Sequence, residues 1–173
     1  MKKLIIALAI AILPVMSFGQ GAFDKFDNND EVTSVVVTKK MFQMMGNVKN
    51  QESQEFLNLI KKLNNLRVFT TTNKAVTADM RNTANAYIKS AGLEELMRVN
   101  DKNQNVRIMV KSGATETRVK ELLMFIEGAN GKAQETVLLS LTGDFDLNEV
   151  SALTEKMNLP GGKELDKVKG PKK

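Results

Sequence analysis

The residue types that most often carry catalysis are missing from this chain. Its 173 residues include no histidine and no cysteine, so the commonest general base, the usual zinc ligands and the thiol nucleophile are absent. These absences exclude a Ser-His-Asp hydrolase and a cysteine peptidase. A carboxylate pair that hydrolyses a glycoside and a Ser–Lys dyad stay formally open, but no Asp, Glu or Ser is set apart by its spacing. We therefore assign no catalytic residue from the sequence.

Two groups of acidic residues could bind a cation. One segment resembles positions 1, 3, 5 and 12 of a calcium loop, which here are Asp144, Asp146, Asn148 and Glu155. Its sixth position, where the loop needs glycine, is Glu149. The simpler interpretation is that Asp146 is a helix N-cap and Glu149 completes a capping box. The second group lacks ligand spacing and is predicted to be a solvated lead-in: Asp24, Asp27, Asp30 and Glu31. We predict no metal and no cofactor at either.

Three methionines recur at helical spacing. Met41, Met44 and Met45 share one face of a predicted helix, and thioethers suit Cu(I) in an exported protein without His or Cys. Methionines at this spacing more often pack a helix against a sheet. We expect them to do so together with Phe42.

A run of three threonines, Thr70 to Thr72, ends a predicted strand. Its hydroxyls could line a polar groove. The favoured interpretation is that Thr72 is the N-cap of the following helix.

The basic charge of the chain lies at its ends. The formal net charge of +5 becomes +3 if Lys2 and Lys3 are removed, and five lysines against Glu164 and Asp166 give residues 163–173 a charge of +3 alone. The body from residue 20 to 162 is therefore neutral, which is untypical of a nucleic-acid-binding domain. The tail could bind anionic headgroups; the simpler prediction is a disordered, solubilising tail over 163–173.

The N-terminus has the pattern of a secretory signal peptide. Lys2 and Lys3 precede the apolar run Leu4–Val15, and Ser17 and Gly19 supply small residues before a cleavage site at Gln20. We expect residues 1–19 to be removed and the protein to be exported, to the periplasm or, as the alternative, to the medium. The cleavage site offers no cysteine for a lipid anchor, and no second apolar stretch is long enough to span a membrane.

Hydrophobic periodicity predicts ten elements. Val119–Glu127 could form a helix by propensity, but the following Asn130-Gly131 pair favours a hairpin and hence a strand. The predicted strands are 31–38, 65–72, 93–100, 105–112, 119–127 and 135–142. The predicted helices are 39–46, 52–63, 77–91 and 146–157. This order indicates a single α+β domain over 20–162, with a mostly antiparallel sheet and helices packed on one face.

The mature chain resembles the family of domain of unknown function 4252, found mainly in the Bacteroidetes. The resemblance is carried by Val35–Phe42, Leu66–Thr72, Glu94–Val99, Glu121–Glu127, Leu141–Asn148 and Lys156–Pro160. It implies kinship with exported proteins, many of them similar to lipoproteins, from which this cysteine-free chain departs. It implies no activity and no site residues.

These observations lead to one expected function and two alternatives. We expect a non-enzymatic exported protein of the cell envelope that binds another protein or a small ligand. The alternatives are an envelope-directed hydrolase with a carboxylate pair and a structural component that self-associates through an unprotected strand edge.

Overall fold

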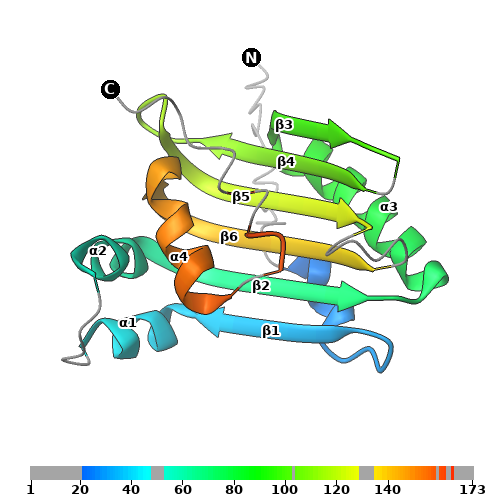
Figure 1. Ribbon diagram of the computed structural model, residues 1–173, viewed down its shortest axis with the longest axis horizontal. Helices are drawn as coiled ribbons and strands as arrows, with labels where there is room; N and C mark the ends of the chain where they lie inside the picture. Colours follow the sequence, from blue (N-terminus) through cyan, green and yellow to red (C-terminus); the bar gives the residue numbers. More distant parts are fainter. Residues whose placement is uncertain are drawn as a thin grey trace, which may run out of the picture.

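A computed structural model describes residues 21–47, 53–102, 104–128, 135–158, 160–162 and 165. The predicted signal peptide and most of the predicted tail lie outside these residues. At the centre is a six-stranded sheet in the order β1-β2-β6-β5-β4-β3, in which every neighbouring pair is antiparallel (Figure 1). Of the helices that the structure describes, none is long and apolar enough to cross a membrane.

The strands and helices follow the predicted order. The strands are β1 (Thr33–Thr38), β2 (Leu63–Thr71), β3 (Glu94–Asn100), β4 (Asn105–Ser112), β5 (Arg118–Glu127) and β6 (Thr136–Asp146). The helices are α1 (Lys39–Asn47), α2 (Gln54–Lys62), α3 (Lys74–Ala91) and α4 (Val150–Met157), with short 3-10 helices η1 (Gly21–Phe26) and η3 (Leu147–Glu149). The prediction of one α+β domain built on an antiparallel sheet is confirmed.

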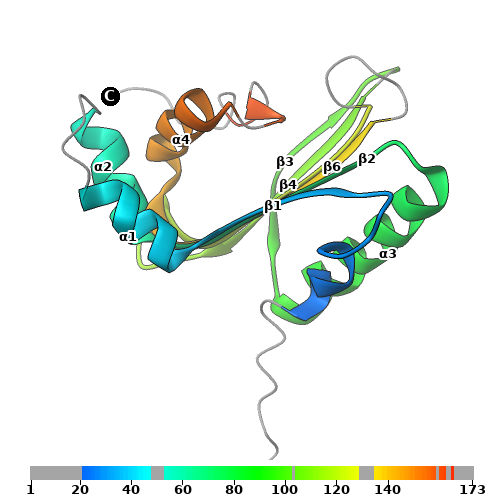
Figure 2. The same cartoon turned by 90° about the horizontal axis from the view of Figure 1, so that it is seen from below.

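The prediction that helices pack on only one face of the sheet is wrong. Figure 2 shows α1, α2 and α4 on one face and α3 with η1 on the other. The central strands are correspondingly buried on both faces: Leu139 of β6 belongs to one buried cluster and its neighbour Leu138 to the other. The unbroken apolar run Leu122–Ile126 of β5 has the same cause, since a strand covered on both faces does not alternate.

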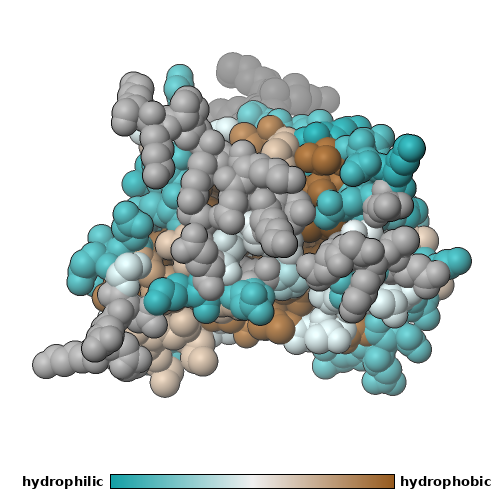
Figure 3. Space-filling model, viewed as in Figure 1, coloured by the Kyte–Doolittle hydropathy of each residue, from teal (hydrophilic) through white to brown (hydrophobic). Residues whose placement is uncertain are grey.

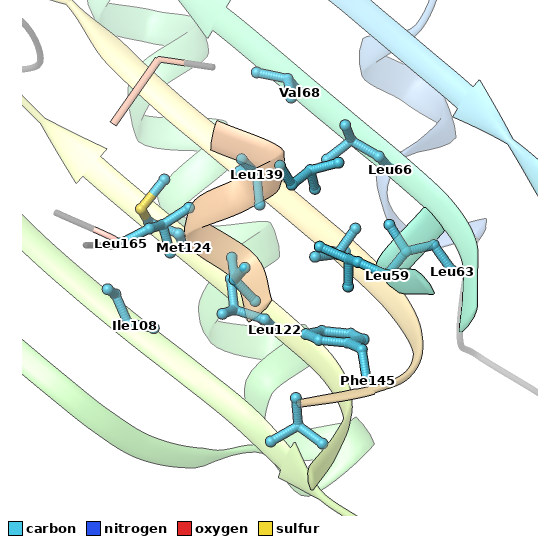
Figure 4. Close-up of a cluster of buried hydrophobic side chains, with 14 of the residues drawn as sticks. Leu59, Leu63, Leu66, Val68, Ile108, Leu122, Met124, Leu139, Phe145 and Leu165 are labelled. Atoms are coloured by element: carbon cyan, nitrogen blue, oxygen red, sulfur yellow. The ribbon is translucent and has the colours of Figure 1, made fainter. Parts of the chain in front are cut away.

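Two hydrophobic cores therefore share one sheet. The first, which we call the α2 core, packs α1, α2 and α4 on the strands, and Figure 4 shows part of it, including Leu59, Leu122, Phe145 and Leu165. The second, the α3 core, packs η1 and α3 on the opposite face and includes Phe23, Phe69, Met80 and Tyr87. Leu165, within the predicted tail, is buried in the α2 core.

The helix ends differ from the predicted caps in two places. Asn73, and not Thr72, caps α3, because its side chain accepts hydrogen bonds from the amides of Ala75 (2.9 Å) and Val76 (3.2 Å). Gly92 ends α3 in the left-handed conformation (φ 65°), which glycine adopts without steric cost. Asp146 does act as an N-cap, of η3. The capping box is not formed, since the Glu149 carboxylate binds the Lys62 ammonium at 2.8 Å.

Candidate functional site

The calcium-like segment does not assemble a cation site. Asp144 binds Arg118 at 2.9 Å, and Asp146 accepts hydrogen bonds from the Thr117 hydroxyl at 2.6 Å and the Asn148 amide at 2.9 Å. Burial alone would raise the pKa of Asp146, but these hydrogen bonds outweigh it, so the pKa lies below its usual range. Nowhere among the described residues do three or more Asp or Glu side chains gather as metal ligands would.

The acidic residues near the N-terminus are only partly a solvated lead-in. Asp24 and Asp27 both bind the Arg67 guanidinium, at 2.7 and 3.0 Å. This arrangement ties η1 and the residue that follows it to β2, and it is a salt bridge, not a pair of carboxylates facing a cleft. Asp30 and Glu31 are exposed.

The methionine face is divided between core and surface. Phe42 is fully buried and Met45 packs on the α2 core, as predicted. Met41 and Met44 do not pack on the sheet: they are 51% and 57% exposed. The reason is the position of α1, which follows an edge strand and contacts the sheet with only one side.

The threonine run lines a polar hollow of about 280 Å³ at the end of β2, together with Asp30, Glu31 and Glu135. Thr71 is buried, and its hydroxyl donates to the Glu31 carbonyl at 2.6 Å. This contact joins β2 to the segment before β1, so the hydroxyl serves the fold.

A buried polar pair that the sequence did not single out lies on the α3 face. The Tyr87 hydroxyl donates to Glu121 at 2.9 Å, and both residues are buried. Burial raises the pKa of the Glu121 carboxyl, against the opposing effects of the Tyr87 hydrogen bond and the Lys111 charge. The side chains lining the hollow of about 530 Å³ beside α3 include Tyr87 but not Glu121, so the carboxyl does not face a cleft.

Three arginines line a hollow of about 230 Å³ on the α3 side of the sheet, and we take this hollow as the candidate binding site. Arg98 of β3 and Arg107 of β4 lie directly opposite one another, and Arg107 lies opposite Phe125 of β5. Arg81 of α3 completes the wall. We call this site the arginine hollow.

The three guanidinium groups of the arginine hollow are held differently. Arg81 binds Glu127, with Nε 3.2 Å from a carboxylate oxygen, and Arg98 binds Glu95, with Nε at 3.1 Å. Arg107 Nη1 donates to the Asn85 side chain at 2.7 Å. Its Nε is buried without a hydrogen-bond partner among the described residues, and no described carboxylate forms an ion pair with it.

Three guanidinium groups against two carboxylates leave one positive charge in excess at the arginine hollow. Like charges directly opposite on neighbouring strands destabilise a sheet. An oxyanion bound between Arg98 and Arg107 would replace the repulsion between the two guanidinium groups with attraction of each group to the anion. The arrangement is therefore suited to binding a small anion.

Comparison with known proteins assigns the chain to a family. The family model for domain of unknown function DUF4252 matches residues 26–153. The chain belongs to this family. Neither the curated proteins nor the solved structures gave a significant match to it.

The DUF4252 match contains the whole arginine hollow. It also contains all six strands and α1 to α3, and it ends within α4. The candidate site is thus part of the DUF4252 domain itself and not of the segments that flank it.

Proposed function

We propose that this protein is a non-enzymatic binding module, exported to the cell envelope, that takes a small oxyanion in the arginine hollow. The observation that carries the proposal is the direct opposition of Arg98 and Arg107 across β3 and β4. Two guanidinium groups in register on one face present several N–H donors toward the same point. Carboxylates and phosphates match these donors bidentately.

The environment of Arg107 supports its role as the main anchor. Arg81 and Arg98 are both partly neutralised by their own carboxylates. Among the described residues, Arg107 has a neutral amide as its side-chain partner, and its buried Nε has none. An unpaired buried donor is costly to the fold, and an incoming oxyanion would reduce that cost. This difference predicts that the affinity depends more on Arg107 than on its neighbours.

The size of the hollow favours a small ligand. About 230 Å³ is less than the 300–1,000 Å³ typical of pockets for drug-sized molecules. Phe125 adds an apolar wall, which suits an anion with a short carbon skeleton as well as inorganic phosphate.

The test is a calorimetric titration of the protein with inorganic phosphate and, separately, with malonate, at ionic strength held constant with chloride. We expect saturable binding of at least one of the two, weakened tenfold or more by Arg107→Gln, equivalent to about 1.4 kcal/mol. The matched control is Arg118→Gln, which removes a surface arginine bound to Asp144 and should leave binding unchanged. No saturable heat with either anion, or equal binding by Arg107→Gln, contradicts the proposal.

The proposed location is tested separately. The basic start and apolar run of residues 1–19 support export. N-terminal sequencing of the protein from the envelope or periplasmic fraction should give Gln20 as the first residue. Recovery of the chain in the cytoplasm with Met1 intact would contradict export without affecting the anion site.

A further inference from the structure

The two edges of the sheet differ in how they are protected. β1 is one edge and β3 the other. An exposed edge strand offers unpaired amides and carbonyls to another chain, and proteins commonly block it with charges, prolines or bulges. β3 carries Glu94, Glu95 and Arg98 and has a register shift between Glu95 and Met97. β3 is thus a protected edge.

β1 has none of these protections. Its sequence Thr33–Thr38 contains no charged residue and no proline, and it pairs with β2 along its whole length without a register shift. In Figure 2, which looks onto this edge, β1 lies in front of the other strands. Its outer side is therefore a regular, uncharged edge of six residues.

Exposed apolar side chains gather at the same edge. Among the described residues five large hydrophobic side chains are exposed, and four of them are on β1 or α1: Val35, Val36, Met41 and Met44. Figure 3 shows apolar atoms at the lower left, where α1 lies in Figure 1, and in the middle of the lower margin, where β1 lies; the right-hand end of this margin is hydrophilic. Val35 and Val36 point to opposite faces by the alternation of a strand, so both faces of the edge are apolar.

The charges that flank β1 indicate which partner fits. Asp30 and Glu31 precede the strand, and Lys39 and Lys40 follow it. All four are exposed, and none forms an ion pair with another described residue. A strand that pairs antiparallel with this edge must be basic where it meets the first pair and acidic where it meets the second. β1 of a second copy meets both conditions.

We propose that the protein forms a symmetric dimer in which the β1 strands of two copies pair antiparallel. A two-fold axis perpendicular to the sheet keeps each face on the same side in both copies, so opposed residues must point to the same face. A register centred on Val35 satisfies this condition and sets Ser34 opposite Val36. The same register sets the end of β1 in one copy against the start of β1 in the other, so Asp30 and Glu31 lie near Lys39 and Lys40, at the start of α1, of the second copy.

This dimer is independent of the proposed anion binding. The arginine hollow lies on β3, β4 and β5, at the far side of the sheet from β1. Pairing through β1 would extend the sheet into one continuous structure and leave both hollows open. Failure of either proposal would not affect the other.

The first test is the molar mass of the purified protein by light scattering and sedimentation over a range of concentrations. We expect a mass twice that of the chain, and monomers for Val35→Lys, because this substitution sets two lysines against each other at the symmetry axis. Val35 is 47% exposed, so the variant should fold, which circular dichroism would verify. The control is Leu96→Lys on the protected edge, 40% exposed, which should remain dimeric.

The second test identifies the register by exchanging charges. The variants Lys39→Glu/Lys40→Glu and Asp30→Lys/Glu31→Lys each place like charges at both ends of the paired edge, so each should be monomeric alone. An equimolar mixture restores opposite charges at both ends and should dimerise. Monomeric unmodified protein up to about 1 mM, a dimeric Val35→Lys variant, or a mixture that stays monomeric would each overturn the proposal.

Discussion

At the scale of single residues, Glu121 is a buried carboxyl whose ionisation bears on the stability of the fold. The residue is 6% exposed, its carboxyl accepts one hydrogen bond from Tyr87, and Oε1 has no partner among the described residues. Ionising such a group places a charge away from water without full compensation by hydrogen bonds, which costs free energy. Its raised pKa expresses this cost.

The consequence is a stability that falls as the pH rises. The folded state binds the Glu121 proton more tightly than the unfolded chain, where the pKa of a glutamate is about 4.3. Its contribution is therefore complete below about pH 4.3 and is lost as the pH rises through the raised pKa of the folded state. Glu121→Gln keeps an oxygen acceptor for Tyr87 and removes the titration. We expect this variant to lack the Glu121 part of the pH dependence when urea unfolding is measured between about pH 4 and pH 8.

The control for the pH series lies at its acidic end. Below about pH 4.3 Glu121 is protonated in the folded and in the unfolded state, so the difference in unfolding free energy between Glu121→Gln and the unmodified protein should no longer change with pH. A Glu121→Gln variant with the same pH dependence as the unmodified protein would show that Glu121 titrates normally in the folded state.

At the scale of elements, the start of α3 distinguishes two neighbouring residues. The Asn73 side chain accepts hydrogen bonds from two backbone amides, whereas Thr72 is exposed. Asn73→Ala should lower the free energy of unfolding by about 1 kcal/mol, and Thr72→Ala should change it by less than about 0.5 kcal/mol. Chemical denaturation of both variants measures the difference. Equal losses, or a larger loss for Thr72→Ala, would contradict the cap assignment.

Most elements could be predicted because their signals are local. Glu52–Leu63 and Thr77–Ala91 have helical periodicity, and the predicted strand Val119–Glu127 is β5 within one residue. The second helical layer is not indicated by the periodicity of the helices. Its signal lies in the unbroken apolar runs of β5 and β6, which indicate strands covered on both faces.

The arginine hollow could have been found from one predicted hairpin. Pairing Asn100 with Asn105, as the turn between these strands implies, sets Arg98 opposite Arg107. Two features have no local signal in the sequence. One is the position of Arg81, on a helix that packs beside this hairpin, and the other is the strand order that leaves β1 at an edge. The strand order depends on the pairing of β2 with β6, which are far apart in the sequence. The position of Arg81 depends on the packing of α3 against one face of the sheet.

At the scale of the whole molecule, two cores share the same strands. Leu139 points into the α2 core and Leu138, the preceding residue of β6, into the α3 core. Neither helical layer can detach without exposing one face of β5 and β6. Unfolding of the two layers should therefore be coupled, as in a two-state domain.

A single substitution tests this coupling. Leu59 of α2 is fully buried in the α2 core, and Leu59→Ala should cost about 2–5 kcal/mol. Tyr87 is the only tyrosine, and the chain has no tryptophan, so intrinsic fluorescence reports on the α3 core alone. We expect Leu59→Ala to move the fluorescence-detected urea midpoint as far as the midpoint from circular dichroism, while Leu96→Ala on the exposed edge moves neither. A fluorescence midpoint that stays in place while circular dichroism shows an earlier transition would mean that the two faces unfold independently, although they are built on one sheet.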